Sequence, residues 1–373
     1  MKSKAHLIQL GLILSFLPTS EVLAQTAPWY HSLLDLEPGA LPRARSTVVA
    51  VIDTGIDQAH PALRSSLWVN TGESGLDDQG RDKKTNGVDD DRNGFIDDVH
   101  GWNFAKHSAR IDDDHGHGTH IAGLIAGESP DFHGVAPGTR LMILKYYDAQ
   151  APIGGNLMNS VRAIRYAVSM GAHILNYSGG GLEPHPEERR ALEDAAKKGV
   201  LVVAAAGNEN TNADALGFYP ASYGLQNILS VMAVGPDRKR LPASNWGQRH
   251  VHLAAPGEAI LSTYLNGQMA YMSGTSQATA LVTGVAVLLR EKHAELKSPE
   301  ALIRWLTQSG RFNSHLVGKS AHPQMLSVRR ALAMESHAED ERPEVLSTYR
   351  PFPESPRKTP RPSRERSASI VRP

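Results

Sequence analysis

Apolar residues in the middle of the chain fall into short runs that are nearly continuous. The six runs that are richest in β-branched residues and alanine cover 47–52, 141–146, 173–177, 200–205, 228–234 and 252–255. Strands with one wet face alternate between apolar and polar residues, whereas continuous runs indicate strands that are covered on both faces. The pattern therefore predicts a central sheet between two other layers.

Segments with helical spacing separate several of these runs. We expect helices over 118–127, 157–170, 186–198 and 277–293. Gly171 and Gly199 follow two of them as stop signals, and Ser298-Pro299 opens one more helix with Ser298 as the N-cap. Alternating strands and helices need crossover connections. The predicted fold class is α/β: a three-layer α/β/α fold with a doubly wound, mostly parallel central sheet.

The first 24 residues have the pattern of a secretory signal peptide. Lys2 and Lys4 are followed by an apolar stretch over 7–17 that is too short to span a bilayer, and small residues precede Gln25. An uncleaved anchor is the alternative, but the polar residues that follow favour cleavage. We expect a secreted protein, extracellular or periplasmic. The chain has no cysteine, so disulfides do not stabilise it.

The chain changes character again near Ser336. Residues 350–373 contain six prolines and seven Lys or Arg against two acids. Such a segment buries too little apolar surface to offset its ordering entropy, so 336–373 is predicted to be a disordered tail. It acts either as a solvated spacer or as a tether to a wall or membrane surface. Between the ends we expect a short arm over 25–45 and one folded domain over 46–335.

The net charge is zero, which argues against nucleic acid as a partner and against stable membrane insertion. No internal repeat indicates an array, and we expect a monomer. The arm is shorter than the roughly 40 residues that an independent domain needs. It is therefore predicted to be extended, packed through Trp29 and Tyr30, and not a folded prodomain.

Three polar residues stand next to buried elements in the order Asp, His, Ser. Asp53 ends the first strand, His117 begins a helix of small residues, and Ser276 follows Gly274-Thr275 before the long helix. This is one of the chain orders of the serine-protease triad, in which the Asp orients the His and the His activates the Ser. Each element alone has a plainer interpretation, as a turn, a packed helix or an N-cap. Their combination favours catalysis.

Asn208 follows the strand over 200–205. Its amide could donate to a tetrahedral oxyanion together with the backbone N–H of Ser276, although an ordinary turn Asn is the alternative. Zinc is a second alternative, since His115, His117 and His120 lie beside Asp112, Asp113 and Asp114. The metalloprotease pattern of two His four apart with a Glu between them is absent.

These motifs resemble those of the subtilisin-like serine proteases, or subtilases. The matching pieces are Val51-Ile-Asp-Thr-Gly-Ile-Asp57, His117-Gly-Thr-His-Ile-Ala-Gly123, Ala205-Ala-Gly-Asn208 and Gly274-Thr-Ser-Gln-Ala-Thr279. The resemblance implies a serine endopeptidase that hydrolyses peptide bonds through an acyl-enzyme, with Asp53, His117 and Ser276 as the triad and Asn208 as the oxyanion donor. Gln277, Ala280 and Leu281 depart from the family's usual Met, Pro and His.

The resemblance also implies substrate-binding residues. Ser178, Gly179 and Gly180 would pair with a protein or peptide substrate as an added β-strand. Phe218, before Tyr219-Pro220, would border the first specificity pocket and leave room for mid-sized apolar side chains. No acid stands at the positions that match, so Arg or Lys would lack a partner.

An acid-rich segment lies between Asp53 and His117. Asp89, Asp91 and Asn93 match the first half of an oxygen-ligand calcium loop, but His100 stands where the closing Glu would be. Asp97 and Asp98 could complete the coordination. We expect a structural calcium and no cofactor for catalysis; the alternative is a solvated acidic turn.

Two rival functions remain open at this point. One is a catalytically silent exported protein that keeps the substrate strand to bind peptides. The other is a zinc hydrolase. Labelling with a serine-directed fluorophosphonate separates the first rival from the protease, and chelator sensitivity separates the second.

Overall fold

The computed structural model of the protein describes residues 28–36, 41–152 and 154–335. The predicted signal peptide and the predicted tail lie outside the described residues. The described residues up to Met334 belong to one compact unit. Of the helices described, none is long and apolar enough to cross a membrane.

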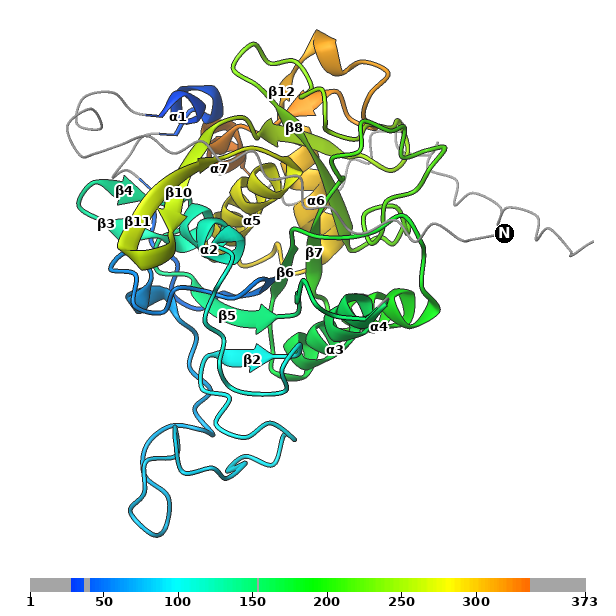
Figure 1. Ribbon diagram of the computed structural model, residues 1–373. Coiled ribbons are helices and arrows are strands. Elements are labelled where there is room, and N and C mark those ends of the chain that lie inside the picture. The colour runs from blue at the N-terminus through cyan, green and yellow to red at the C-terminus, as the bar shows by residue number, and fades with distance from the viewer. Residues whose placement is uncertain (1–27, 37–40, 153, 336–373) are drawn as a thin grey trace, which may run out of the picture. The chain divides into compact units, whose positions relative to one another are not determined.

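A nine-stranded sheet has the order β12-β13-β9-β8-β7-β6-β1-β5-β2 (Figure 1). Its six long strands are β1 (Val48–Asp53), β5 (Arg140–Lys145), β6 (Ile174–Tyr177), β7 (Leu201–Ala205), β8 (Ile228–Val234) and β9 (Leu253–Pro256). The edges are β2 (Gly101–Asn103), β12 (Arg311–Phe312) and β13 (Gln324–Met325). Only β12 and β13 pair antiparallel. The hydrophobic pattern predicts the six long strands but not the edges, because two or three residues are too few to show a period.

Helices cover both faces of the sheet. Val49 and Val51 of β1 belong to a core shared with α2 (His117–Ala126), α5 (Thr275–Lys292), α6 (Pro299–Gln308) and α7 (Val328–Ala333). Ala50 and Ile52 point to the other face, where the core includes α3 (Gly155–Ser169) and α4 (Pro186–Lys197). Successive residues of a buried strand serve opposite faces, which explains the continuous apolar runs. The three-layer α/β/α prediction is confirmed.

Smaller elements decorate this framework. They are the hairpins β3 (Glu128–Ser129) with β4 (Phe132–His133) and β10 (Ile260–Tyr264) with β11 (Gln268–Met272), and the 3-10 turns η1 (Arg64–Ser66), η2 (Leu265–Gly267) and η3 (Ser314–Leu316). The β10–β11 hairpin packs on α2. It therefore helps to fix the helix that begins at His117.

The N-terminal arm is not extended as predicted. Trp29–Leu34 forms the short helix α1, in which Tyr30 and Leu34 join the core shared with α2 and α5. The Asp35 carboxylate accepts two hydrogen bonds from Arg311 Nη2, at 2.7 and 2.6 Å, and one from Ser327 Oγ at 2.7 Å. A helix suits this segment because it buries several apolar side chains on one side within a few residues.

The strand order places β1 where the sheet reverses its winding. β1 pairs with β5 on one side and with β6 on the other. The chain first fills the β2 and β5 side and then crosses β1 to reach β6, so the direction of winding changes here. Open α/β sheets bind ligands outside the carboxyl ends of their strands at such a switch point. Asp53 is the last residue of β1, which makes this edge the place to look for chemistry.

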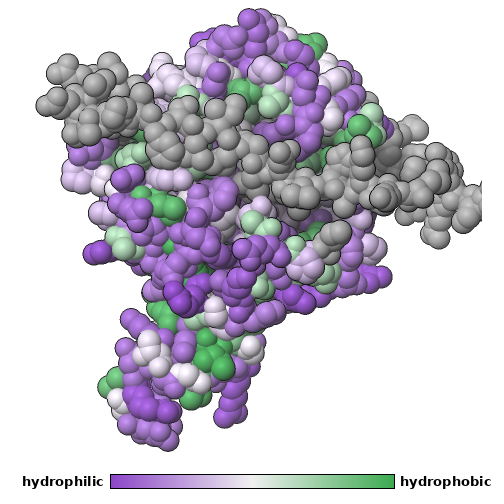
Figure 2. Space-filling view, in the orientation of Figure 1, coloured by the Kyte–Doolittle hydropathy of each residue, from purple (hydrophilic) through white to green (hydrophobic). Residues whose placement is uncertain are grey.

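The acidic segment before β2 is held differently from the rest of the unit. In Figure 1 it extends well away from the sheet, and Figure 2 shows apolar surface on this extension. Its exposed apolar residues are Val69, Leu76, Val88 and Ile96, and no apolar side chain between 70 and 98 is fully buried. Apart from Phe95, which packs on the core beside α3, the segment is held mainly by polar contacts.

Candidate active site

Asp53 and His117 lie in direct contact at the end of β1. His117 is the first residue of α2, and its Nδ1 is 2.7 Å from Asp53 Oδ1. The same carboxylate oxygen accepts the Thr54 N–H at 2.8 Å, and both side chains are buried. Burial lowers the pKa of His117, but the charge and hydrogen bond of Asp53, with Asp113, outweigh it, and the net pKa is raised. The pair can therefore hold an imidazole in one tautomer and stabilise its cation.

Asp113 fixes the start of α2. Its carboxylate accepts hydrogen bonds from the backbone of His115, Gly116 and Thr119, at 2.9 to 3.0 Å. Burial raises the pKa of Asp113, but these bonds and the Thr119 hydroxyl lower it more, so the net pKa is lowered. A carboxylate at free helix N–H groups is a favourable arrangement. Asp113 thus positions His117, a role that its place beside three histidines did not reveal.

Close packing completes the support of His117. A β-carbon at position 118 would lie 2.2 Å from the carbonyl oxygen of Gly55 and 3.2 Å from the β-carbon of Asp53. Only glycine allows this approach of helix to strand end. The small residues of α2 therefore allow the helix to come close enough for the short contact between Asp53 and His117.

Ser276 lies at the start of α5, the second residue of the helix. Its Oγ donates to the carbonyl of Ser178 at 3.0 Å, and Ser178 Oγ donates to the carbonyl of Ser276 at 3.3 Å. Asn176 Nδ2 donates to Ser178 Oγ at 3.0 Å, and Thr283 Oγ1 donates to Asn176 Oδ1 at 2.8 Å. Asn176 and Thr283 are buried, so this network locks α5 to β6. Nothing in the sequence pattern distinguishes these two residues from other core-facing polar ones.

The Asn208 side chain lies beside the same helix start. Its Oδ1 accepts the Thr275 N–H at 3.0 Å and the Thr275 hydroxyl at 3.2 Å. With the oxygen occupied in this way, the amide nitrogen is the group left to donate. A donor here stands next to the Ser276 backbone N–H and the positive end of the α5 dipole, as an oxyanion site requires.

The Ser178–Gly180 segment follows β6, and its glycines are required by close neighbours. A β-carbon on Gly179 would lie 2.1 Å from the Tyr146 hydroxyl, and one on Gly180 would lie 2.5 Å from the Phe218 ring. Gly181 then pairs antiparallel with Tyr219, with N···O distances of 2.9 and 2.7 Å. The segment therefore continues from β6 to the Gly181–Tyr219 bridge and lies beside the start of α5.

Phe218 is buried and borders this strand, but an acid that we did not expect lies close by. A β-carbon on Gly207 would be 2.8 Å from the Phe218 ring and 2.5 Å from Glu209 Oε2. Glu209 lies in the loop 209–218, outside the positions at which the sequence showed no acid. Glu209 Oε2 accepts from Asn245 Nδ2 at 2.7 Å, and burial raises the pKa of this carboxyl. Its charge is thus already engaged.

The acidic segment brings together a set of ligands that differs from the predicted one. Of the His, Asp and Glu residues that the structure describes, one group of three has its oxygens within 4.8 Å of one another: Glu73, Asp89 and Asp91. Glu73 is fully buried, and its Oε2 lacks a hydrogen-bond partner among the described residues. Burial, together with the charges of Asp91 and Asp98, raises the pKa of Glu73 against its backbone hydrogen bonds. The sequence prediction missed Glu73, which lies well before the acid-rich motif.

Asp98 and Asn93 lie beside this group and hold the surrounding loop through hydrogen bonds. Asp98 is buried and accepts from Asn70 at 2.8 Å, Asn93 at 2.9 Å and the Tyr166 hydroxyl at 2.5 Å. Asp97 Oδ1 accepts the Gly87 N–H at 3.1 Å. Of the predicted ligands, Asp89 and Asp91 are the two whose oxygens lie in the group with Glu73.

The zinc alternative finds no support in the geometry. His117 faces Asp53, whereas His120 Nε2 lies 3.0 and 3.1 Å from the carbonyls of Ile260 and Ala270. Asp113 is engaged by the start of α2. The described residues around His117 form no group of three potential ligands. His117, His120 and Asp113 thus contact different partners and do not converge on a shared metal site.

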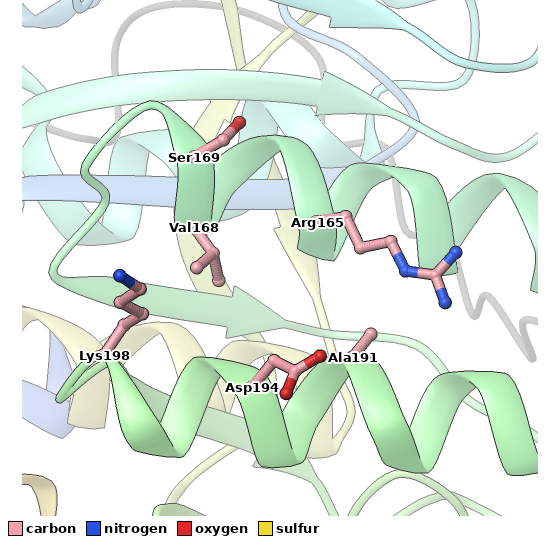
Figure 3. Close-up of a pocket in the computed structure, with 6 residues that line it drawn as sticks. All are labelled: Arg165, Val168, Ser169, Ala191, Asp194 and Lys198. Carbon is pink, nitrogen blue, oxygen red and sulfur yellow. The ribbon is translucent and has the colours of Figure 1, made fainter.

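A groove between α3 and α4 lies apart from this chemistry. Figure 3 shows it with its lining residues, Arg165, Val168, Ser169, Ala191, Asp194 and Lys198. None of them belongs to the strand ends or to the start of α5. The groove is a gap between two helices and not the substrate site.

Comparisons with known proteins agree with this geometry. The subtilase family signature matches residues 44–330. The "Major intracellular serine protease" of Bacillus subtilis (strain 168) is 33% identical over 257 residues, which cover 68% of this chain and 71% of that protein. The "Intracellular serine protease" of Paenibacillus polymyxa is 35% identical over 254 residues, or 67% and 68% of the two chains.

Solved structures share the fold. A cold adapted subtilisin-like serine proteinase aligns with a TM-score of 0.64 at 24% identity, over 82% of this chain and 99% of that one. The self-cleaved protease domain of PatA aligns with a TM-score of 0.57 at 27% identity, over 78% and 97%. The family signature spans most of the chain, and the sheet and the residues at its strand ends agree with it. The chain therefore belongs to the subtilase family and is a serine-type endopeptidase.

Proposed function

We propose that the protein hydrolyses peptide bonds through an acyl-enzyme formed on Ser276. His117 Nε2 takes the proton of the Ser276 hydroxyl as the oxygen attacks the scissile carbonyl, and then returns it to the leaving amine. Asp53 holds the imidazole and stabilises its cation. The observation that carries the proposal is the buried 2.7 Å contact between Asp53 and His117 at the strand edge that also bears the start of α5.

The Asn208→Ala variant should lose about 10²–10³ in kcat, the loss that removal of one such donor causes in subtilisin. The structure supports this role because Thr275 holds Asn208 Oδ1 and leaves the amide to donate. KM should change little, since the oxyanion exists only in the transition state. The check is steady-state kinetics on a peptide anilide, with Asn210→Ala as the control. A kcat within threefold of wild type would remove Asn208 from the oxyanion site.

Substrates should carry a mid-sized apolar side chain before the scissile bond. The buried Phe218 ring fills space beside Gly180 and Gly207, and Asn245 already engages the Glu209 carboxylate. A peptide-library cleavage profile of the purified protein tests the preference. Phe218→Gly should shift it towards larger aromatic residues, whereas Glu209→Gln should leave the apolar preference in place. A dominant preference for Arg or Lys would contradict the proposal.

We propose in addition a structural calcium ion in the acidic segment. Three carboxylates converge there, one of them buried with an oxygen that lacks a partner among the described residues, and Phe95 is the one side chain of the segment that packs on the apolar core. Hard oxygen donors suit Ca²⁺, and an ion would neutralise the mutual repulsion of the three acids. Glu73, Asp89 and Asp91 would hold it directly, while Asn93, Asp97 and Asp98 shape the surrounding loop.

Removing calcium should lower the thermal midpoint by about 5–10 °C, since a ligand at a hundredfold excess over Kd adds about 2.7 kcal/mol. Scanning calorimetry in calcium and in EDTA measures the shift. Glu73→Gln and Asp89→Ala should each abolish it, whereas Asp78→Ala, an exposed acid of the same segment, should not. Equal thermal midpoints in the two buffers would contradict the calcium site and leave the solvated turn as the interpretation of the segment.

We also propose export, which rests on the pattern of the first 24 residues. The mature chain should then begin at Gln25, upstream of the docked helix α1. Two of the curated relatives are named as intracellular enzymes. N-terminal sequencing of the protein recovered from a fractionated host tests the proposal; an intact Met1 in the cytoplasmic fraction would contradict it.

A further inference from the structure

One acid of α4 is turned inward, unlike its neighbours. Glu187, Glu193 and Asp194 are partly or well exposed and pair with Arg or Lys. Glu188 is 1% exposed, and the groups that donate hydrogen bonds to its carboxylate are tyrosine hydroxyls. Acids are almost never fully buried unless they are paired. A buried carboxylate whose partners are neutral hydroxyls is therefore unusual, and its presence calls for an explanation.

The Glu188 carboxylate bridges two separate parts of the chain. Its Oε1 accepts from the Tyr177 hydroxyl at 3.2 Å, and its Oε2 accepts from the Tyr223 hydroxyl at 2.8 Å. The Tyr223 oxygen in turn accepts the His185 N–H at 2.8 Å. The first turn of α4 is thus fastened to the end of β6 and to the chain after Phe218.

Both tyrosines adjoin the segments that were assigned above to substrate. Tyr177 immediately precedes Ser178. The Tyr223 ring lies against the Tyr219 ring, with 4.7 Å between centroids, and Tyr219 pairs with Gly181. The two walls beside the scissile bond, the Ser178–Gly180 strand and the segment around Phe218, therefore share one anchor.

We propose that Glu188 is a positioning residue, whose two hydrogen bonds fix the spacing between these walls and so set the affinity for extended peptides. The inference rests on the proposed function, because it takes the Ser178–Gly180 strand to be where substrate pairs. Glu188 itself touches neither substrate nor the triad. It acts through Tyr177 and Tyr223.

The groups around Glu188 make this anchor sensitive to pH. Three tyrosines face its carboxylate: Tyr146 just after β5, Tyr177 of β6, and Tyr223 in the chain after Phe218. Arg189 donates to the backbone oxygen of Tyr223 at 3.3 Å. His185 caps α4, and Arg165 of α3 pairs with Glu187. Burial, opposed by the tyrosine hydrogen bonds, raises the pKa of Glu188 to about 7.

The direction of the effect follows from the chemistry of the two hydrogen bonds. An ionised carboxylate accepts a charge-assisted hydrogen bond from each tyrosine. Protonation removes the charge and makes one tyrosine oxygen accept instead of donating, so both bonds become weaker neutral ones. The walls are therefore fixed above pH 7 and loosened below it. Affinity for a peptide that pairs along the strand should fall as the pH drops through this range.

The test measures binding without turnover. A fluorescent peptide that spans several residues before the scissile bond is titrated into Ser276→Ala and into Ser276→Ala with Glu188→Gln, from pH 5.5 to 8.5. At pH 8.5 Glu188→Gln should raise the Kd about tenfold, the size expected when a hydrogen bond to a buried charge is weakened. The two Kd values should converge near pH 5.5. His117 is present in both proteins, so their difference reports Glu188.

Controls separate positioning from simple stability. Asp194→Asn, an exposed acid on the same helix, should leave the Kd unchanged. A single-residue substrate analogue that cannot pair along the strand should bind both proteins equally. Tyr223→Phe should reproduce part of the loss and add little to Glu188→Gln; it also serves if Glu188→Gln fails to fold.

The outcomes for the two proposals are distinct. Parallel Kd curves at all pH values, or equal weakening of the short analogue, would overturn the positioning role. If the Ser276→Ala protein itself still hydrolysed the peptide, the proposed function would fail, whatever Glu188 does.

Discussion

Replacing Ser276 with alanine should lower kcat by about 10⁶, the size of the loss that removal of the nucleophile causes in subtilisin. The Ser276 hydroxyl oxygen is the atom that forms the acyl-enzyme, and the neighbouring Thr275 hydroxyl donates to Asn208 Oδ1 instead. Ser276 Oγ makes one hydrogen bond, to the carbonyl of Ser178, so the fold should tolerate its loss. Casein hydrolysis and circular dichroism, measured together, check both statements.

The matched control is Ser273→Ala. Ser273 lies three residues earlier, and its hydroxyl accepts the Ala259 N–H at 2.8 Å, away from the triad. This variant should keep kcat within a few-fold of wild type. Wild-type turnover in Ser276→Ala, or an equal loss in Ser273→Ala, would show that the mechanism has been assigned to the wrong hydroxyl.

The second large effect is expected at Asp53. Asp53→Asn should reduce kcat by about 10⁴, as the equivalent change does in the chymotrypsin-type triad. An amide nitrogen that faces His117 Nδ1 favours the tautomer with its proton on Nε2, which cannot accept the serine proton. The Thr54 N–H also donates to Oδ1 and favours an amide oxygen at that position, but in either orientation the variant lacks the negative charge that stabilises the imidazolium.

The pH profile gives Asp53→Asn a readout that a folding defect would not imitate. His117 must be neutral to act as a base, so activity falls as the pH drops through its raised pKa. Removing the Asp53 charge removes the main cause of that rise. The acid limb of kcat/KM should therefore move to lower pH in the variant. An acid limb at an unchanged or higher pH would mean that Asp53 does not raise the pKa of His117.

The sequence was sufficient for the elements that depend on local patterns. The long strands are continuous apolar runs, and each of the predicted helices has a period or a cap that is visible in the chain. Asp53 and Asn208 could be proposed because each follows a buried strand run, and His117 because it begins a helix of small residues. Such positions are brought to one edge by a parallel sheet, whatever the details of packing.

Residues that act across the fold could not be found in this way. Glu188 looks like any other acid on an amphipathic helix until Tyr177 and Tyr223 are placed around it. Glu73 joins Asp89 and Asp91 only because the intervening chain folds back. The helix α1 depends on a partner, Arg311, at the far end of the chain. Long-range contacts of this kind leave no period or spacing in the sequence.

The most direct test of the central claim is to locate the covalent adduct of a fluorophosphonate. The purified full-length protein is treated with the reagent, digested, and mapped by mass spectrometry. The triad at the end of β1 and the start of α5 predicts one adduct per chain, on Ser276, and none in Asp53→Asn on the same timescale. An adduct on another serine, or no adduct on a chain that still cleaves casein, would contradict it.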